Sequence, residues 1–199
     1  MNRKRSLRSL GLGLLIGLLG ALIGLHPATS GWEEGVGLGL LFQLRGQRPA
    51  PPDVAIISIN GDTASQLGLG EEIPEWPRSL HARLIERLHQ AGVAVIAFDI
   101  FFKKPRDEAQ DAQLAEAISR AGNVLLVAYL ERRRMLSRGR TLYIERLIPP
   151  LESLDQAAAG VAPFVLPKVP VRVNRFWTFN GDNALPSLPV LALDLLADP

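Results

Sequence analysis

The side chains that could do chemistry in this sequence stand at the ends of two apolar segments. Asn60, Asp62 and Thr63 follow one of these segments, and Asp99 comes directly after the other, residues 93–98. Open α/β sheets bind ligands beyond the carboxyl ends of their strands, because loops and helix N-termini converge there. If the two segments are adjacent strands, these polar groups lie near one another and form a candidate site.

Asp99 is the most suggestive of these residues, because a carboxylate at the end of a buried strand needs a partner. An unpaired buried charge is expensive to desolvate. We expect Arg78 as that partner, since its helix starts at the same edge in a βαβ arrangement; the backbone amides of residues 60–63 are the alternative. The pair serves either the architecture alone or ligand binding. Trp76 completes the candidate ligand site, although packing is the simpler interpretation of this ring.

Several familiar kinds of site are missing from the sequence. The chain has no cysteine, which excludes disulfides and thiolate metal ligands. His81 and His89 stand eight residues apart on one predicted helix, too far to share a metal without further ligands. No phosphate loop, dinucleotide fingerprint or nucleophile elbow occurs. We therefore expect no metal, no cofactor and no catalytic residue.

The charge of the chain does not point to a nucleic-acid partner. Its 22 basic and 20 acidic residues give a net charge of +2. Arg3, Lys4, Arg5 and Arg8 account for this excess, since removing these four leaves 18 basic against 20 acidic residues. The 199 residues suffice for one domain with a sizeable core and accessory segments.

The apolar patterns predict an α/β fold with a mainly parallel sheet and flanking helices. Apolar runs at residues 54–59, 93–98 and 124–130 are predicted strands. Helical periodicity and glycine stops predict helices at residues 79–91 and 107–121. The alternation of strands and helices argues for parallel strands joined by right-handed crossovers.

Further elements are predicted on either side of this unit. Asp62 is the expected cap of a short helix at residues 63–69, and a charged hairpin or loop is expected at residues 131–140. The remaining expectations are a strand at 141–148, a short helix at 149–159 ended by Gly160, an exposed strand at 169–179 and a packing helix at 187–196.

The N-terminus has the composition of a membrane anchor. Residues 9–25 carry no charge, follow a basic segment at residues 1–8, and approach the ~20 residues that a spanning helix needs. We expect a single transmembrane helix in the inner membrane, a juxtamembrane segment and linker at 26–52, and an extracytoplasmic (periplasmic) domain at 53–199. A signal peptide cleaved after Ser30 is the competing interpretation.

A stripe of glycines marks one face of that predicted helix. Gly13, Gly17, Gly20 and Gly24 recur at helical spacing. Small residues let membrane helices approach closely, so the stripe predicts a homodimer or helix-packing face. A glycine-rich anchor without a partner is the equally open alternative.

Several stretches of the sequence together resemble the type-two CHASE family, which comprises extracytoplasmic sensing domains associated with cyclases and histidine kinases. They read VAIISINGDT (54–63), WPRSLHARLIERL (76–88), AGVAVIAFDIFF (91–102) and DAQLAEAISRAGNVLLV (111–127), preceded by LFQLRG (41–46). The likeness covers roughly residues 33–199. It implies a bacterial receptor whose membrane helices and cyclase or kinase output would follow the sensor, so we expect a truncated sensor module.

The sequence departs from that family after the first predicted strand. An acidic pair usual there is replaced by Asn60 and Gly61, and Asp62 is the candidate substitute. Our leading interpretation is a membrane-anchored sensor of an unknown small molecule or envelope signal, without catalysis of its own. The alternatives are an envelope hydrolase that uses Asp62 and Asp99 as a carboxylate pair, and an envelope scaffold without a ligand.

Overall fold

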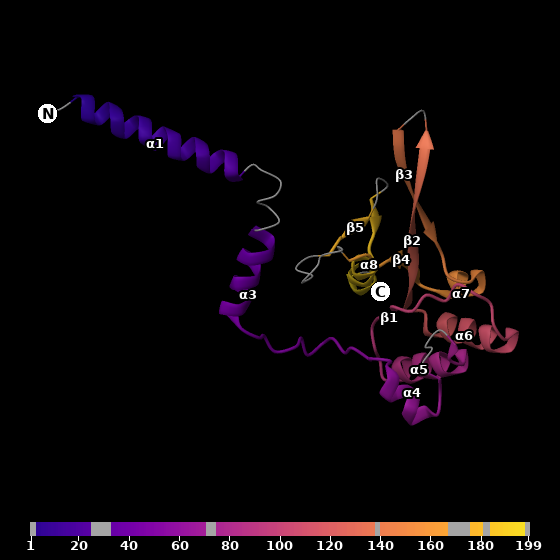
Figure 1. Cartoon of the computed structure of the whole chain (residues 1–199). Helices are drawn as coiled ribbons and strands as arrows, with labels where there is room; N and C mark the ends of the chain where they lie inside the picture. The colour runs from indigo at the N-terminus through magenta and orange to yellow at the C-terminus, as the bar shows by residue number, and fades with distance from the viewer. Residues whose placement is uncertain are drawn as a thin grey trace. The chain divides into compact units, whose positions relative to one another are not determined.

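The computed structural model divides into two compact units (Figure 1), Met1–Ala55 with Lys168–Arg175 and Ile56–Pro167 with Phe176–Pro199. The structure describes residues 3–24, 33–70, 75–137, 140–166, 176–180 and 184–197.

The described part of the first unit is helical. It contains α1 (Arg3–Gly24), a π-helical segment (Glu33–Leu38) and α3 (Gly39–Arg45). Gly46 caps the end of α3: its φ of 73° lies in the left-handed region that glycine tolerates, and its N–H donates to the carbonyl oxygens of Phe42 and Gln43.

The expected transmembrane helix is wrong. No helix in the described residues is long and apolar enough to cross a membrane. The uncharged part of α1 runs over the sixteen residues 9–24, about 24 Å at 1.5 Å per residue, and a bilayer core is about 30 Å thick. The single-pass membrane anchoring predicted from this segment is therefore unsupported.

The second unit is built on a mixed sheet around one long strand, β2 (Val124–Ser137). The first half of β2 lies between β1 (Ile96–Phe98) and β4 (Gly160–Pro163), parallel to both. Its second half pairs antiparallel with β3 (Arg140–Ile148). The predicted α/β class is confirmed, but the mainly parallel sheet is wrong, because the charged segment after residue 130 continues β2 into a hairpin.

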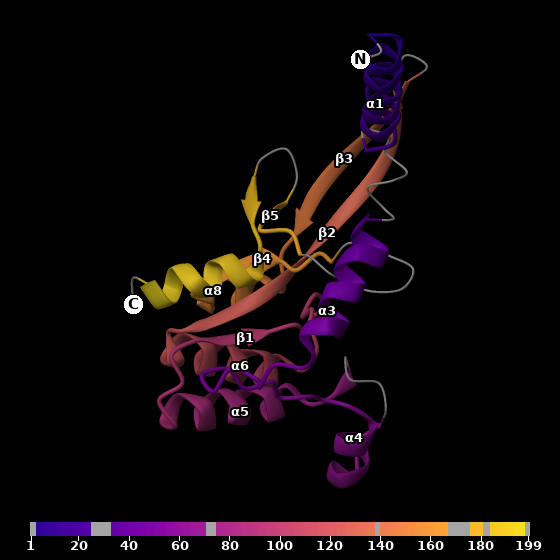
Figure 2. The same ribbon diagram turned by 90° about the vertical axis from the view of Figure 1, so that its left-hand side faces the viewer.

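The two faces of the sheet are covered by different helices (Figure 2). Alternate residues of β2 point to opposite faces: Val124 and Leu126 pack with α5, α6 and α7, whereas Leu125 and Val127 pack beside α8. These helices are α5 (Arg78–Gln90), α6 (Glu108–Ala121), α7 (Glu152–Ala157) and α8 (Leu188–Ala197). Five consecutive buried residues, 124–128, therefore make β2 the centre of two cores.

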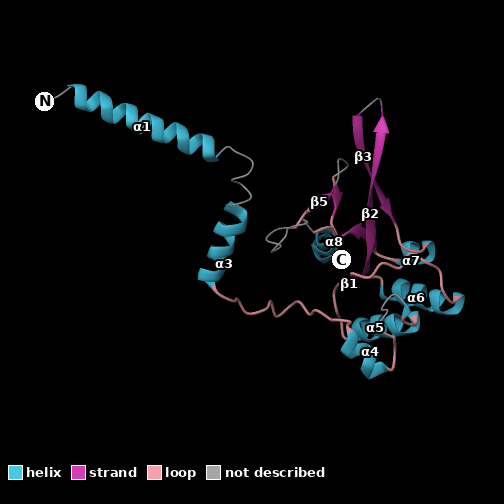
Figure 3. Cartoon of the chain, in the orientation of Figure 1, coloured by secondary structure: helices cyan, strands magenta, loops and turns pink. Residues whose placement is uncertain are grey.

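The rest of the hairpin extends beyond the parallel core, where its strands stand out as a separate pair (Figure 3). Burial ends at Ala128, and Tyr129 is exposed. The prediction of a strand at 141–148 is confirmed, and the charged hairpin is confirmed with strand geometry in place of a loop.

Most predicted helices of this unit are confirmed. Glycines at positive φ follow α5 and α6 (Gly92 and Gly122), as their sequence positions indicate. The C-terminal packing helix is α8, and the short helix before Gly160 is α7. Two small elements complete the unit: α4 (Gly61–Leu67) and the pair β5 (Phe179–Asn180) and β6 (Leu185–Pro186).

Two predicted segments differ in the structure, and a third is described only in part. Residues 54–59 form no helix or strand and join no sheet in the described chain, and Ile56 is 91% exposed, so the expected first strand is wrong. Gly160 begins β4 and does not end a helix. A Cβ there would stand 3.2 Å from the side chains of Leu125 and Leu191, so glycine allows α8 to approach β4 closely. Most of the strand expected at 169–179 lies outside the described residues.

Candidate functional site

A hollow of about 280 Å³ lies where the N-terminus of α5 meets the loop that follows β1. We call it the α5 hollow. It is lined by Glu75, Trp76, Arg78, His81, Ile100, Phe101, Phe102, Lys103, Lys104 and Arg106. This is the carboxyl end of a parallel strand, where α/β folds place ligand sites.

The wall of the α5 hollow is aromatic and buried. The indole Nε1 of Trp76 donates a hydrogen bond of 2.7 Å to the carbonyl oxygen of Gly70, which fixes the ring. The imidazole of His81 packs edge-on against Phe98 and Phe102, with ring centroids 6.0 and 5.3 Å away. Phe98 and Phe102 also contact one another, with centroids 6.0 Å apart, so these three rings support each other in the wall.

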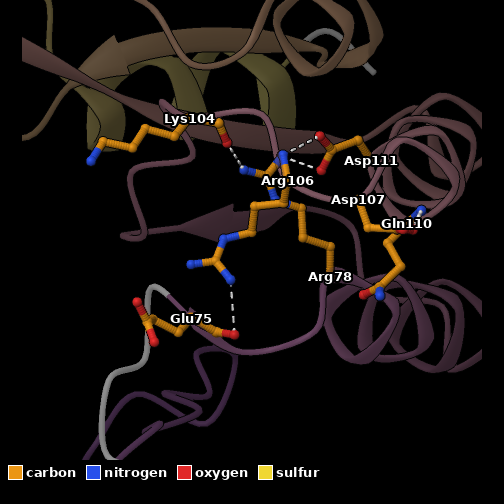
Figure 4. A network of polar contacts seen from close by, with 7 residues as sticks. All are labelled: Glu75, Arg78, Lys104, Arg106, Asp107, Gln110 and Asp111. Carbon is orange, nitrogen blue, oxygen red and sulfur yellow. Dashed lines mark hydrogen bonds and ion pairs between the residues drawn. The ribbon is translucent and has the colours of Figure 1, made fainter.

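One buried arginine ties three segments together beside this wall (Figure 4). Arg78 Nη1 lies 2.7 Å from Asp111 Oδ1, and its Nη2 donates to the carbonyl oxygen of Lys104. Its guanidinium also faces the ring of Phe102, 5.5 Å from the centroid. The second carboxylate oxygen of Asp111 accepts the backbone N–H of Arg106 at 2.8 Å. The start of α5, the loop after β1 and the start of α6 are thus linked through one ion pair.

Burial lowers the pKa of the two ionisable side chains in this wall, His81 and Arg78. Burial, and to a smaller extent the nearby positive charge of Arg78, lowers the pKa of His81 to about 4, so the imidazole is neutral at pH 7. Burial also lowers the pKa of Arg78, while Asp111 opposes the change by stabilising the cation. The wall therefore carries a paired cation beside a neutral imidazole.

The rim of the α5 hollow is exposed and mostly basic. Lys103, Lys104 and Arg106 stand there, and Glu75 is the single acidic residue among the described ones that line the hollow. The guanidinium of Arg106 donates a 2.9 Å hydrogen bond to the backbone carbonyl of Glu75, which joins the two sides of the opening. The excess of positive charge makes the rim attractive to anions.

The structure brings together two of the six predicted site residues. Trp76 and Arg78 line the α5 hollow. Asn60 and Thr63 form a capping box at the start of α4: the Asn60 side chain accepts the Thr63 N–H at 3.1 Å, and Thr63 Oγ1 accepts the Asn60 N–H at 3.4 Å. Asp62 is exposed in the first turn of that helix, so the expectation that Asp62 is its cap is wrong.

The expected shielding of Asp99 and its pairing with Arg78 are both wrong. Asp99 is exposed, and the ion pair of Arg78 is made with Asp111. The physical reason is the alternation of side chains along β1, whose residues are buried, exposed and buried in turn. Asp99 follows the exposed Ala97 by two residues and is itself exposed, so its carboxylate needs no buried partner.

The sequence indicates the burial of two further residues near the hollow that were not among the predicted site residues. His81 stands four residues before Ile85 and Asp111 three residues before Leu114, so both lie on the buried faces of their helices. A charged residue on an apolar helix face calls for a partner. The basic loop at 103–106 gave no such signal, because surface charge runs are usually only solvated.

The predicted glycine stripe was not assembled into a site. Gly13, Gly17, Gly20 and Gly24 lie on α1, and a Cβ at any of them would meet nothing within 4 Å in this chain; the homodimer face stays a prediction. No group of three or more His, Asp or Glu residues in the described ranges is arranged to hold a metal ion.

Comparison with known proteins gives one match. A family model described as the CHASE2 domain matches residues 13–197. The resemblance of the sequence to the type-two CHASE family is confirmed by this match. No curated protein and no solved structure matches the chain.

Proposed function

Because the chain belongs to the CHASE2 domain family, whose domains are extracytoplasmic sensors and not catalysts, we propose that it detects a small molecule in the α5 hollow for a bacterial signalling receptor. The single observation that carries the choice of site is the junction at Arg78. This residue lines the hollow and at the same time holds the loop after β1 and helix α6.

The junction offers a path from a bound molecule to the fold. A ligand that touches the loop at residues 103–106 acts on the two backbone groups, Lys104 O and Arg106 N, that bind Arg78 and Asp111. Moving these groups changes how α5 is held against α6. Binding then shifts the population between two arrangements of the helices, provided the ligand prefers one of them.

The hydrolase alternative has less support. Its two proposed carboxylates, Asp62 and Asp99, are both exposed, and neither lines the α5 hollow. A general acid or base is expected in a site that perturbs its pKa and excludes water. A scaffold without a ligand would leave the hollow without a role.

The location of the domain can be tested by single-cysteine labelling, because the natural chain has no cysteine. Gln113→Cys places a thiol on the exposed face of α6, and Ala117→Cys places one on the buried face as a matched control. In spheroplasts, a membrane-impermeant maleimide should label the first thiol, and the second should react only after denaturation. Labelling of the first thiol only after cell lysis would contradict an extracytoplasmic location.

Sensing itself can be tested by joining the full chain to the membrane and cyclase segments of a receptor and measuring cyclic AMP. The output should respond to fractions of culture medium. Ile100→Trp fills the α5 hollow and should abolish that response. Leu67→Trp, the same kind of change at an exposed end of α4, should preserve it. An equal response in both variants would overturn the proposal.

A further inference from the structure

We propose that the α5 hollow takes a small organic anion, with the acidic group at the basic rim and an apolar part against the aromatic wall. This inference deepens the proposed function by giving the chemical class of the ligand, and it relies on that function only for the ligand's biological role.

Charged and apolar side chains are separated within the α5 hollow. The exposed side chains of Lys103, Lys104 and Arg106 stand at the opening, while Trp76 and Phe102 are each at most 6% exposed in the wall. A ligand that is polar at one end and apolar at the other matches both surfaces. A fully polar anion would leave the aromatic wall unused, and an apolar molecule would leave the rim cations without a counter-charge.

The buried cation of the hollow has a counter-charge, whereas the cations at the rim have none within the described residues. Arg78 is paired with Asp111. In the described chain, neither Lys103 nor Lys104 makes a side-chain ion pair, and Arg106 binds only the uncharged carbonyl of Glu75. The free positive charge therefore lies at the opening, where an acidic group can keep part of its hydration.

The wall also contains a polar ring that has no hydrogen-bond partner among the described residues. His81 lines the α5 hollow and is 3% exposed, yet no described residue hydrogen-bonds to its ring. A neutral imidazole has one N–H donor and one acceptor nitrogen. Neither ring nitrogen is among the fully buried atoms without a partner in the described residues, so the ring is accessible to bond a ligand atom or a water that a ligand displaces.

The size of the space limits the ligand. About 280 Å³ is at the small end of the range for ligand pockets, which suits one ring with one acidic group and not a nucleotide or a peptide. Benzoate is therefore a suitable probe. Benzamide has the same shape without the charge, and acetate has the charge without the ring.

Binding is measured on the full chain by calorimetric titration with the three probes at low ionic strength. Benzoate should bind saturably and more tightly than either benzamide or acetate, and added salt should weaken it. If benzamide binds as tightly as benzoate, the rim does not recognise the charge. If acetate binds as tightly as benzoate, the aromatic wall does not recognise the ring. No saturable binding of benzoate would overturn the proposal.

Charge-matched variants locate the site. Lys103→Gln with Lys104→Gln should weaken benzoate binding about three- to tenfold, the size expected for two exposed ionic contacts. Arg83→Gln with Arg87→Gln removes the same charge from exposed positions of α5 that do not line the hollow, and should leave binding unchanged. Equal weakening in both pairs would reduce the effect to general electrostatic attraction and contradict the site.

The histidine rings give an independent readout by NMR. The ring signals of His81 should shift during the benzoate titration, whereas those of His89, exposed near the end of the same helix, should stay in place. The variant His81→Phe identifies which signals belong to His81. A titration that leaves the His81 signals unchanged would contradict binding in the α5 hollow.

These outcomes separate the ligand class from the sensor role. Benzoate binding with a cyclase output that stays insensitive to every medium fraction would support the ligand class and contradict the proposed function. A medium-dependent output that Ile100→Trp abolishes, without benzoate binding, would support the function and overturn the ligand class.

Discussion

Two polar clusters at the starts of neighbouring helices are held in opposite ways. At α4, Asn60 and Thr63 satisfy one another across three residues, in contact with water. At α5, Arg78 pairs with Asp111, 33 residues later in the chain (111 − 78), and both side chains are less than 10% exposed. The first cluster forms wherever its own helix turn forms. The second exists only when α5 and α6 are packed against each other.

This difference predicts where stability is concentrated. A local cap stabilises one short helix and competes with water for the same groups. A buried ion pair contributes little by its presence but costs much when one partner is removed, because the other charge stays buried. The four predictions below test that contrast, from the largest expected effect to the smallest.

Asp111→Ala should lower the free energy of unfolding by about 3–5 kcal/mol, because it leaves the guanidinium of Arg78 buried without its counter-charge. Denaturant unfolding measures the loss. Glu116→Ala, at an exposed site of the same helix, is the control and should change stability little. If Arg78→Met restores part of the stability of Asp111→Ala, the loss comes from the unpaired charge; a loss equal to that of the control would refute the contrast.

The pH dependence should show the neutral state of His81. Its folded pKa of about 4 lies below the unfolded value of 6.5, so the unfolded chain binds the proton first and stability falls as the pH drops from about 6.5 to about 4. The shift corresponds to about 3 kcal/mol at the low end of this window. His81→Phe should flatten this part of the stability profile. An unchanged slope in that variant would show that other groups cause it.

Asn60→Ala should destabilise α4 by about 1 kcal/mol through loss of the capping box. Amide hydrogen exchange of residues 61–67 is the suitable measurement, because the effect is local. Gln66→Ala, exposed within the same helix, serves as the control. Exchange that also accelerates in α5 and α6 would show that this cluster is coupled to the buried pair after all.

Asp99→Ala should change the free energy of unfolding by less than about 0.5 kcal/mol, because its carboxylate is exposed at the end of an edge strand. Thermal unfolding beside Asp111→Ala gives the direct comparison. A loss close to that of Asp111→Ala would restore the buried role that the sequence suggested for Asp99.

The sequence determined the local elements of the second unit. Apolar periodicity and glycine stops place α5 and α6 within a residue or two of their observed ends, because a helix stop depends on the backbone freedom of one residue. The start of the central strand was equally evident from the apolar run at 124–130. The family resemblance, which rests on such stretches in combination, was also visible in the sequence and is confirmed.

Local patterns were insufficient where a segment's role depends on its neighbours. Residues 54–59 and β4 illustrate this from opposite sides: the first looks like a strand and pairs with nothing in the described chain, whereas Gly160 looks like a helix stop and begins a strand. Strand pairing requires two segments. The composition and periodicity of one segment do not show which other segment will pair with it.

The tertiary structure alone decided which carboxylate pairs with Arg78. Asp99 and Asp111 are equivalent as residue types: Asp99 follows the apolar run at 93–98, and Asp111 lies in the first turn of α6. The packing of α6 against α5 buries Asp111 and leaves Asp99 in water. The cost of desolvation then selects the pair, since only a buried charge requires a partner.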